Sequence, residues 1–139
     1  MSDENKAIAL RYCEEFWGKG KKDVADELLS KNFIYHGPDA EESVDRESYI
    51  KESMEYNKFC VDTRFFAEDI IAEGNKVVIR GTWSGKHIGG LFDAPPTDRR
   101  LTINIINIFQ LADGDIVGEW EGSDYLLDVK QQLGLIPTE

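Results

Sequence analysis

The spacing of apolar residues predicts helices in the first part of the chain and strands in the second. Over residues 4–17 apolar side chains recur at every third or fourth position, which predicts a helix with one buried face. The same spacing predicts further helices over residues 23–29, 45–58 and 125–133. Asp45 is placed to cap the third of these, after an aromatic-rich strand at 32–36 and a polar surface loop at 39–45.

After residue 60 apolar and polar side chains alternate, which is the period of a strand with one buried face. This alternation predicts long strands over residues 61–72, 76–87, 101–111 and 115–123. Short turns at 73–75 and 112–114 join the first pair and the last pair, so each pair should form an antiparallel hairpin.

The order of these elements predicts the fold class. Helices come first, then a run of strands, then one helix, which is typical of an α+β fold. We expect a strongly curved antiparallel sheet, covered by the N-terminal helices and enclosing a cone-shaped interior. The length of 139 residues favours a single domain over residues 1–139.

Residues 88–100 form a connection much longer than a hairpin needs. Gly89-Gly90 give this connection a flexible arm, and Pro95-Pro96 give it a stiff one. It is expected either to cover the mouth of a pocket as a lid or rim, or to contact another subunit.

Charge and composition exclude several classes of protein. The net charge of −11 argues against nucleic-acid binding, which needs clustered Lys and Arg. There is no apolar run of the roughly 18–20 residues that span a bilayer and no secretory leader pattern, so we expect a cytoplasmic protein that is not in a membrane. Cys13 and Cys60 lack metal-ligand spacing and are expected to be reduced. The segment 103–108 (INIINI) is apolar on both faces, which predicts a homodimer.

Three stretches of the second half carry a family resemblance: GKHIGGLFDAPPTDRR, FQLADGDIVGEWEGSD and QQLGLIP. They resemble the SnoaL-like polyketide cyclase family of the nuclear transport factor 2-like superfamily, most strongly over residues 80–137. The resemblance implies a cystatin-like, cone-shaped α+β barrel, usually dimeric, with a pocket between the sheet and the helices. Family members that close polyketide rings perform an aldol condensation without a metal or cofactor, using one acidic side chain.

The resemblance aligns the acid/base residue of these members with Glu121, and a histidine on the preceding strand with Asn107. The turn decides which way Glu121 points. A two-residue turn at 113–114 would pair 107 with 120 and place Trp120 on the face of Asn107. A three-residue turn with a bulge would pair 107 with 119, so that Glu119 and Glu121 share that face. The alignment favours the second register.

Other polar side chains have both a functional and a structural interpretation. Asp124 lies where it could act as a catalytic acid or cap the last helix. His36 and His87 could line the pocket or be structural, and no close ligand spacing supports a metal site. The candidate substrate-binding side chains are Tyr12, Phe16, His36, Trp83, His87, Ile105 and Trp120.

The leading hypothesis is a cofactor-independent polyketide cyclase or isomerase-type enzyme that acts on a small hydrophobic carbonyl compound. Glu121 would be its acid/base and Asn107 its orienting partner. The alternatives are a non-catalytic protein that binds a small hydrophobic ligand in the same pocket, and a protein-interaction domain.

Overall fold

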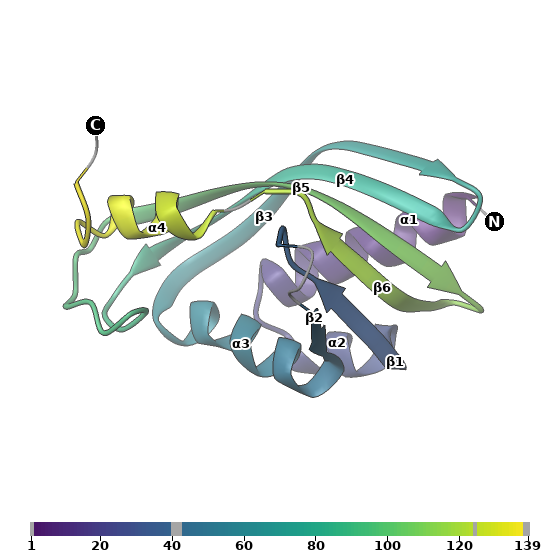
Figure 1. Cartoon of the computed structure of the whole chain (residues 1–139), viewed down its shortest axis with the longest axis horizontal. Coiled ribbons are helices and arrows are strands. Elements are labelled where there is room, and N and C mark those ends of the chain that lie inside the picture. The colour runs from purple at the N-terminus through teal and green to yellow at the C-terminus, as the bar shows by residue number, and fades with distance from the viewer. Residues whose placement is uncertain (1, 40–42, 124, 138–139) are drawn as a thin grey trace.

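The computed structural model describes residues 2–39, 43–123 and 125–137. The elements in chain order are α1 (Ser2–Arg11), the π-helical η1 (Tyr12–Trp17), α2 (Lys22–Leu28), β1 (Leu29–His36), β2 (Ser43–Asp45), α3 (Arg46–Lys58), β3 (Cys60–Glu73), β4 (Lys76–His87), β5 (Arg100–Ala112), β6 (Asp115–Glu121) and α4 (Leu126–Gln132) (Figure 1). None of the helices in these segments is both long and apolar enough to cross a membrane.

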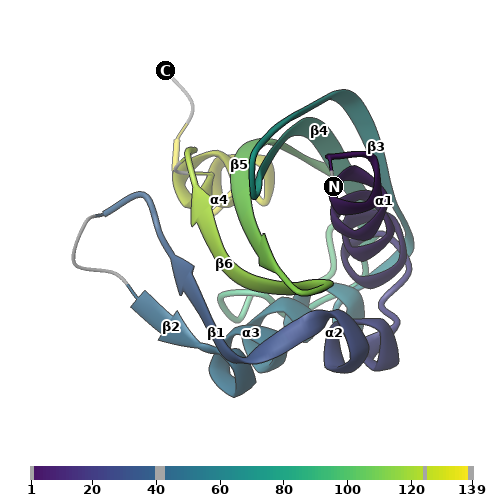
Figure 2. The same cartoon turned by 90° about the vertical axis from the view of Figure 1, so that its right-hand side faces the viewer.

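The expected α+β fold is confirmed. Six strands form one sheet in the order β2-β1-β6-β5-β4-β3, and β3 to β6 are joined as antiparallel neighbours, as the two short turns predict. The sheet curves around α1 and α3 but does not close into a barrel (Figure 2). Two features differ from the expectation: β1 pairs with β6 in parallel, and part of the segment expected as a loop forms β2 against β1. Both pairings join segments distant in the sequence, which local patterns do not reveal.

The first helix changes its winding at the residues that face the sheet. η1 continues α1 with wider turns, and the backbone N–H of Gly18 donates to the carbonyl of Cys13. A Cβ at Gly18 would lie 2.3 Å from the carbonyl oxygen of Glu14, so this close turn requires glycine. The wider turns bring Tyr12 and Phe16 into full burial against the sheet.

The hairpin between β5 and β6 sets the direction of the acidic residues. Asp113 and Gly114 both have positive φ, as in a type I′ turn, and Ala112 pairs with Asp115. The turn therefore has two residues, not three. A shift in the register then follows on β6, so that Asn107 pairs with Glu121. The expected pairing of 107 with 119 is therefore wrong, because Glu119 pairs with Phe109. Glu119 and Glu121 still lie on the side of Asn107, as expected, but a bulge inside the strand produces this arrangement rather than the turn.

The outer face of the sheet carries a transverse row of apolar side chains. Ile71, Val78, Ile108 and Trp120 are successive cross-strand partners from β3 to β6. Along β5, exposed and buried side chains alternate: Ile106 is 49% exposed, whereas Ile105 is buried. Only one face of the INIINI segment is therefore covered within this chain.

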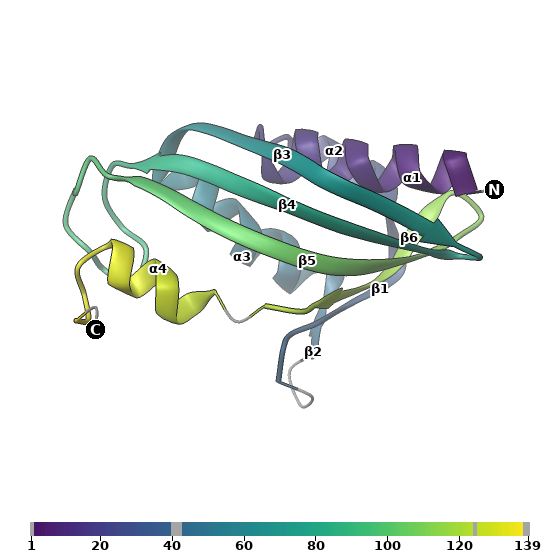
Figure 3. The ribbon, with the colours of Figure 1, turned by 90° about the horizontal axis from the view of Figure 1, so that it is seen from above.

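At the far end of the sheet, α4 lies beside β5 and the long connection (Figure 3). The side-chain amide of Gln132 pairs with both backbone groups of Thr102, and Arg99 donates to the carbonyl of Gln132 at 2.9 Å. These bonds hold the chain beyond β6 against the connection that follows β4. The two segments together border the cavity described next.

Candidate functional site

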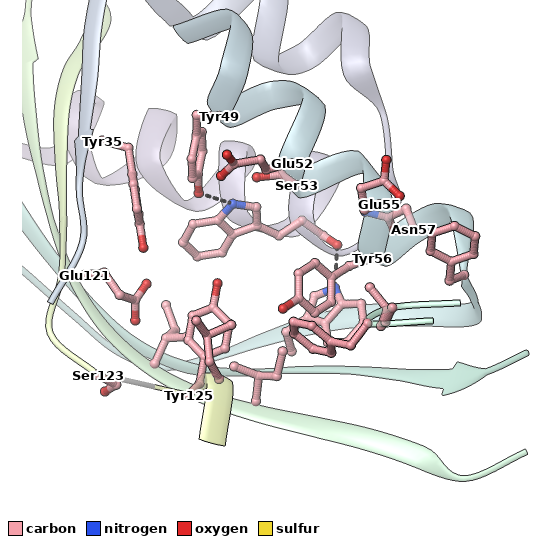
Figure 4. A pocket seen from close by; sticks show the side chains of 18 of the residues that line it. Tyr35, Tyr49, Glu52, Ser53, Glu55, Tyr56, Asn57, Glu121, Ser123 and Tyr125 are labelled. Carbon is pink, nitrogen blue, oxygen red and sulfur yellow. Dashed lines mark hydrogen bonds between the residues drawn. The ribbon is translucent and has the colours of Figure 1, made fainter. Parts of the chain in front are cut away.

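A cavity of about 1170 Å³ opens between α3, the inner face of the sheet, the 88–99 connection and the start of α4. Its walls are rich in aromatic rings, including those of Trp17 and Trp83. Figure 4 shows the rings of Tyr49 and Tyr56 among them. Such a volume is slightly larger than the roughly 300–1,000 Å³ of most small-molecule sites. The concave, aromatic surface can enclose a compound of several fused rings.

Glu121 ends β6 and lies at the wall of this cavity (Figure 4). Its side chain is 7% exposed, and its Oε1 atom has no hydrogen-bond partner among the described residues. Burial raises the pKa of this carboxyl from 4.5 to about 7, against the opposing effects of the Asn107 side chain and the backbone N–H of Ser123. Glu121 can therefore both accept and donate a proton near neutral pH.

A second carboxylate, Glu119, lies fully buried behind Glu121. It accepts a hydrogen bond of 2.6 Å from Nδ2 of Asn107, and the hydroxyls of Tyr49 and Tyr12 lie at 3.4 and 3.5 Å. Trp17 donates in turn to the hydroxyl of Tyr49 at 3.1 Å. Burial, and then the charge of Glu121, hold the pKa of Glu119 well above its usual range. The two carboxyls therefore disfavour simultaneous ionisation.

The cavity brings together only part of the residue set expected from the sequence. Glu121, Trp83 and Ile105 line it. Asn107 is buried behind the wall and reaches Glu119. Asp124 lies outside the described residues.

Five expected binding residues, namely Tyr12, Phe16, His36, Trp120 and His87, lie outside the lining formed by the described residues. Tyr12 and Phe16 are core residues that stack on each other. His36 and Trp120 stack at 4.7 Å, and Trp120 is 37% exposed. Trp120 alternates with Glu119 and Glu121 along β6, so the register that turns the carboxylates inward turns this ring outward.

His87 holds the long connection in place. Its ring nitrogens lie 2.7 Å from the carbonyl oxygen of Gly90 and 3.0 Å from the hydroxyl of Thr97, and it is fully buried. Of the two interpretations of His87, pocket lining and structural support, its position fits the structural one. The connection contributes residues 90–93 to the cavity, which is the position expected of a rim.

Sequence reasoning missed several residues of the site. Glu119 was considered only in the register argument, yet it is the centre of the buried hydrogen-bond network. Tyr35, Tyr56 and Tyr125 line the cavity from three different elements. Their aromatic type is compatible with core packing, so no local signal separates them from core residues.

Comparisons with known proteins agree with this architecture. AclR, a candidate hydroxylase from Streptomyces galilaeus, is 21% identical with a TM-score of 0.87, covering 99% of this chain and 100% of that one. IdmH, a candidate polyketide cyclase from Streptomyces antibioticus, is 26% identical with a TM-score of 0.76, covering 93% and 98%. A Catenulispora acidiphila protein with a ketosteroid isomerase-like fold, solved with trimethylamine, is 14% identical with a TM-score of 0.71, covering 94% and 93%.

The likeness to these structures shows the nuclear transport factor 2-like fold that the sequence resemblance implied. No curated protein matches the sequence. The sequence model of the SnoaL-like polyketide cyclase family matches residues 7–133, and the chain therefore belongs to this family.

Proposed function

We propose that the protein is a cofactor-independent enzyme that uses Glu121 as a general acid/base on a hydrophobic carbonyl compound. The observation that carries this proposal is the unpartnered Oε1 atom of Glu121 at the wall of the cavity, in a carboxyl with a pKa of about 7. A base with a pKa near the working pH combines a large ionised fraction with adequate basicity. The family membership supports an enzyme of this general type.

The proposed reaction begins with proton transfer to Glu121 from the carbon next to a carbonyl. The electron pair of the broken C–H bond moves to the carbonyl oxygen and forms an enolate. In a ring closure, the enolate carbon bonds to a second carbonyl carbon of the same molecule, and Glu121 returns its proton to the new alkoxide. In an isomerisation, the proton returns to another carbon.

The tyrosines of the cavity can stabilise the enolate oxygen. Tyr56 and Tyr125 are largely buried, and burial raises the pKa of Tyr56 to about 12 and that of Tyr125 well above its usual range. They therefore keep their protons at neutral pH and remain hydrogen-bond donors. Donors aimed at a developing oxyanion contribute strongly in a site that excludes water.

The test is exchange of carbon-bound hydrogen for deuterium in 1-tetralone and 2-tetralone in D₂O, followed by NMR. We expect catalysed exchange that increases with pH through about 7, because the ionised form of Glu121 is the base. Glu121→Gln should abolish exchange without changing the far-UV circular dichroism spectrum, and the exposed-site control Glu73→Gln should exchange as the wild type does. Exchange that is unchanged in Glu121→Gln, or absent for both ketones in the wild type, would contradict the proposal.

A non-catalytic binding protein is the second candidate. Nδ2 of Asn107 already donates a hydrogen bond to Glu119. The next inward-facing position on β5 holds the apolar Ile105. Among the described residues, only the Asn107 side chain and the backbone N–H of Ser123 favour the ionised form of Glu121. A tight ligand of the cavity that is recovered unaltered after long incubation would favour this second function.

A further inference from the structure

The charged residues in the wall of the cavity all have the same sign. Among the described residues, the acidic lining side chains are Asp39, Glu52, Glu55, Asp93 and Glu121, and no Lys, Arg or His accompanies them. They come from α3, from the 88–99 connection, from β6 and from the segment after β1. Negative charge thus surrounds the cavity from several directions.

Three of these carboxylates are left without a cationic partner in the described part of the chain. Glu52, Glu55 and Asp93 form no ion pair there. Elsewhere most arginines form ion pairs, and Arg80, for example, lies 2.7 Å from Asp69. The arginines in these ion pairs therefore bind carboxylates that lie outside the lining of the cavity.

Glu52 and Glu55 lie three residues apart on α3, which places them on adjacent turns of one helix face. Figure 4 shows Glu52 beside Ser53, and Glu55 further along the α3 side of the cavity. Glu52 is exposed and Glu55 half-buried. The pair therefore forms a negative edge that water also reaches, as expected at a mouth rather than in the interior.

The inner part of the cavity provides an independent indication of what the ligand must donate. Glu121 is more than nine-tenths buried, and its Oε1 atom faces no donor within the described residues. A buried acceptor without a partner costs free energy that a ligand N–H or O–H group can recover. Carboxylate oxygens that a ligand N–H or O–H group could reach therefore lie both at the mouth and at the inner wall of the cavity.

The aromatic walls suit a cation as well. Positive charge is attracted to the face of an aromatic ring, most strongly to that of Trp, and Trp17 and Trp83 both line the cavity. The protein already uses this interaction at the border, where Lys58 and Lys130 lie 5.1 Å from the ring centroids of Phe59 and Phe92. These two lysines contact rings of the lining, and they are fewer than the lining carboxylates.

We infer that the compound bound in this cavity is a cation: a ring system whose apolar body packs against the aromatic walls and whose protonated or quaternary amine lies near Glu52 and Glu55. Compounds with a carboxylate or phosphate group would be repelled. The inference names the ligand class for the cavity of the proposed function and rests on that cavity being the ligand site.

The test compares three probes with one naphthalene body: (2-naphthylmethyl)trimethylammonium, its neutral tert-butyl analogue 2-neopentylnaphthalene, and 2-naphthylacetate. Dissociation constants come from equilibrium dialysis at low salt. We expect the cation to bind about tenfold more tightly than the neutral analogue, and the anion to bind most weakly. The preference should shrink as salt is added, because the acids at the mouth are open to water.

The matched variants locate the effect. The double variant Glu52→Gln/Glu55→Gln should lose most of the preference for the cation, and Glu68→Gln/Glu73→Gln, with the same change in charge at exposed positions of β3, should keep it. A neutral probe that binds as tightly as the cation would overturn the inference. Equal loss in the two double variants, or no binding of the cation at millimolar concentration, would overturn it too.

Binding preference and turnover can fail separately. A preference for the cation without tetralone exchange would support the ligand class and contradict the catalytic role of Glu121. Exchange that requires Glu121, without any preference for the cation, would support the catalytic role of Glu121 and contradict the inferred ligand class.

Discussion

Replacing Glu121 by Gln should stabilise the protein at neutral pH, although it should abolish the proposed activity. The folded-state pKa of about 7 lies above the ordinary value of 4.5 because burial disfavours the charged form. In the unfolded chain the carboxyl is hydrated and titrates at its ordinary value. Between these two pH values the folded protein binds the proton more tightly than the unfolded chain does.

The sign and size of the effect follow from this difference. Below pH 4.5 Glu121 is protonated in both states and costs nothing, and as the pH rises through 7 the protein loses up to about 3 kcal/mol of its free energy of unfolding. Gln has nearly the same shape and does not ionise. The stability of Glu121→Gln minus that of the wild type should therefore be small at pH 4.5 and about 3 kcal/mol at pH 8.

Urea unfolding followed by tryptophan fluorescence at several pH values between 4.5 and 8 measures this difference. Glu73→Gln, at the exposed end of β3, is the matched control for the loss of one carboxyl group. A difference that stays constant with pH, or a variant that is less stable than the wild type at pH 8, would refute the assigned environment of Glu121.

Three further predictions concern the surroundings of the site and the outer face. Tyr49→Phe removes a hydroxyl that contacts Glu119, and should lower the free energy of unfolding by about 1 kcal/mol in urea. Gly90→Ala places a Cβ 2.3 Å from an aromatic ring and should weaken ligand binding in dialysis, whereas Gly74→Ala, which meets no atom within 4 Å, should not. We propose that the apolar row on the outer face joins two copies of the chain, so Ile108→Lys should convert a dimer into a monomer in sedimentation equilibrium, and a wild-type monomer at micromolar concentration would contradict this.

Strand β6 contributes two buried carboxyls with different surroundings, Glu119 and Glu121. Glu119 is held by donors from η1, α3 and β5, whereas Oε1 of Glu121 has no donor in the described chain. The inner carboxyl is thus satisfied and the outer one is left to a ligand. Sites that bind or react commonly retain such an unfavourable feature, at a cost in stability.

Local patterns in the sequence were sufficient for the elements and for one face of the sheet. The Asp45 side chain accepts from the N–H of Ser48 at 2.9 Å as a helix cap, and both short turns form hairpins, because caps and turns depend on residues that are neighbours in the chain. Side chains alternate along a strand, so any register that turned Glu121 inward also turned Glu119 inward.

Only the tertiary structure decided which of these residues share a site. The bulge on β6, the parallel pairing of β1 with β6 and the position of His87 under the long connection all depend on contacts between distant segments. The sequence also left the tyrosines of the cavity indistinguishable from core residues, because an aromatic side chain follows the same pattern in both places. Folding brings several helices and strands and the 88–99 connection around one space, and that arrangement makes Glu121 a buried carboxyl at a cavity wall rather than an exposed strand residue.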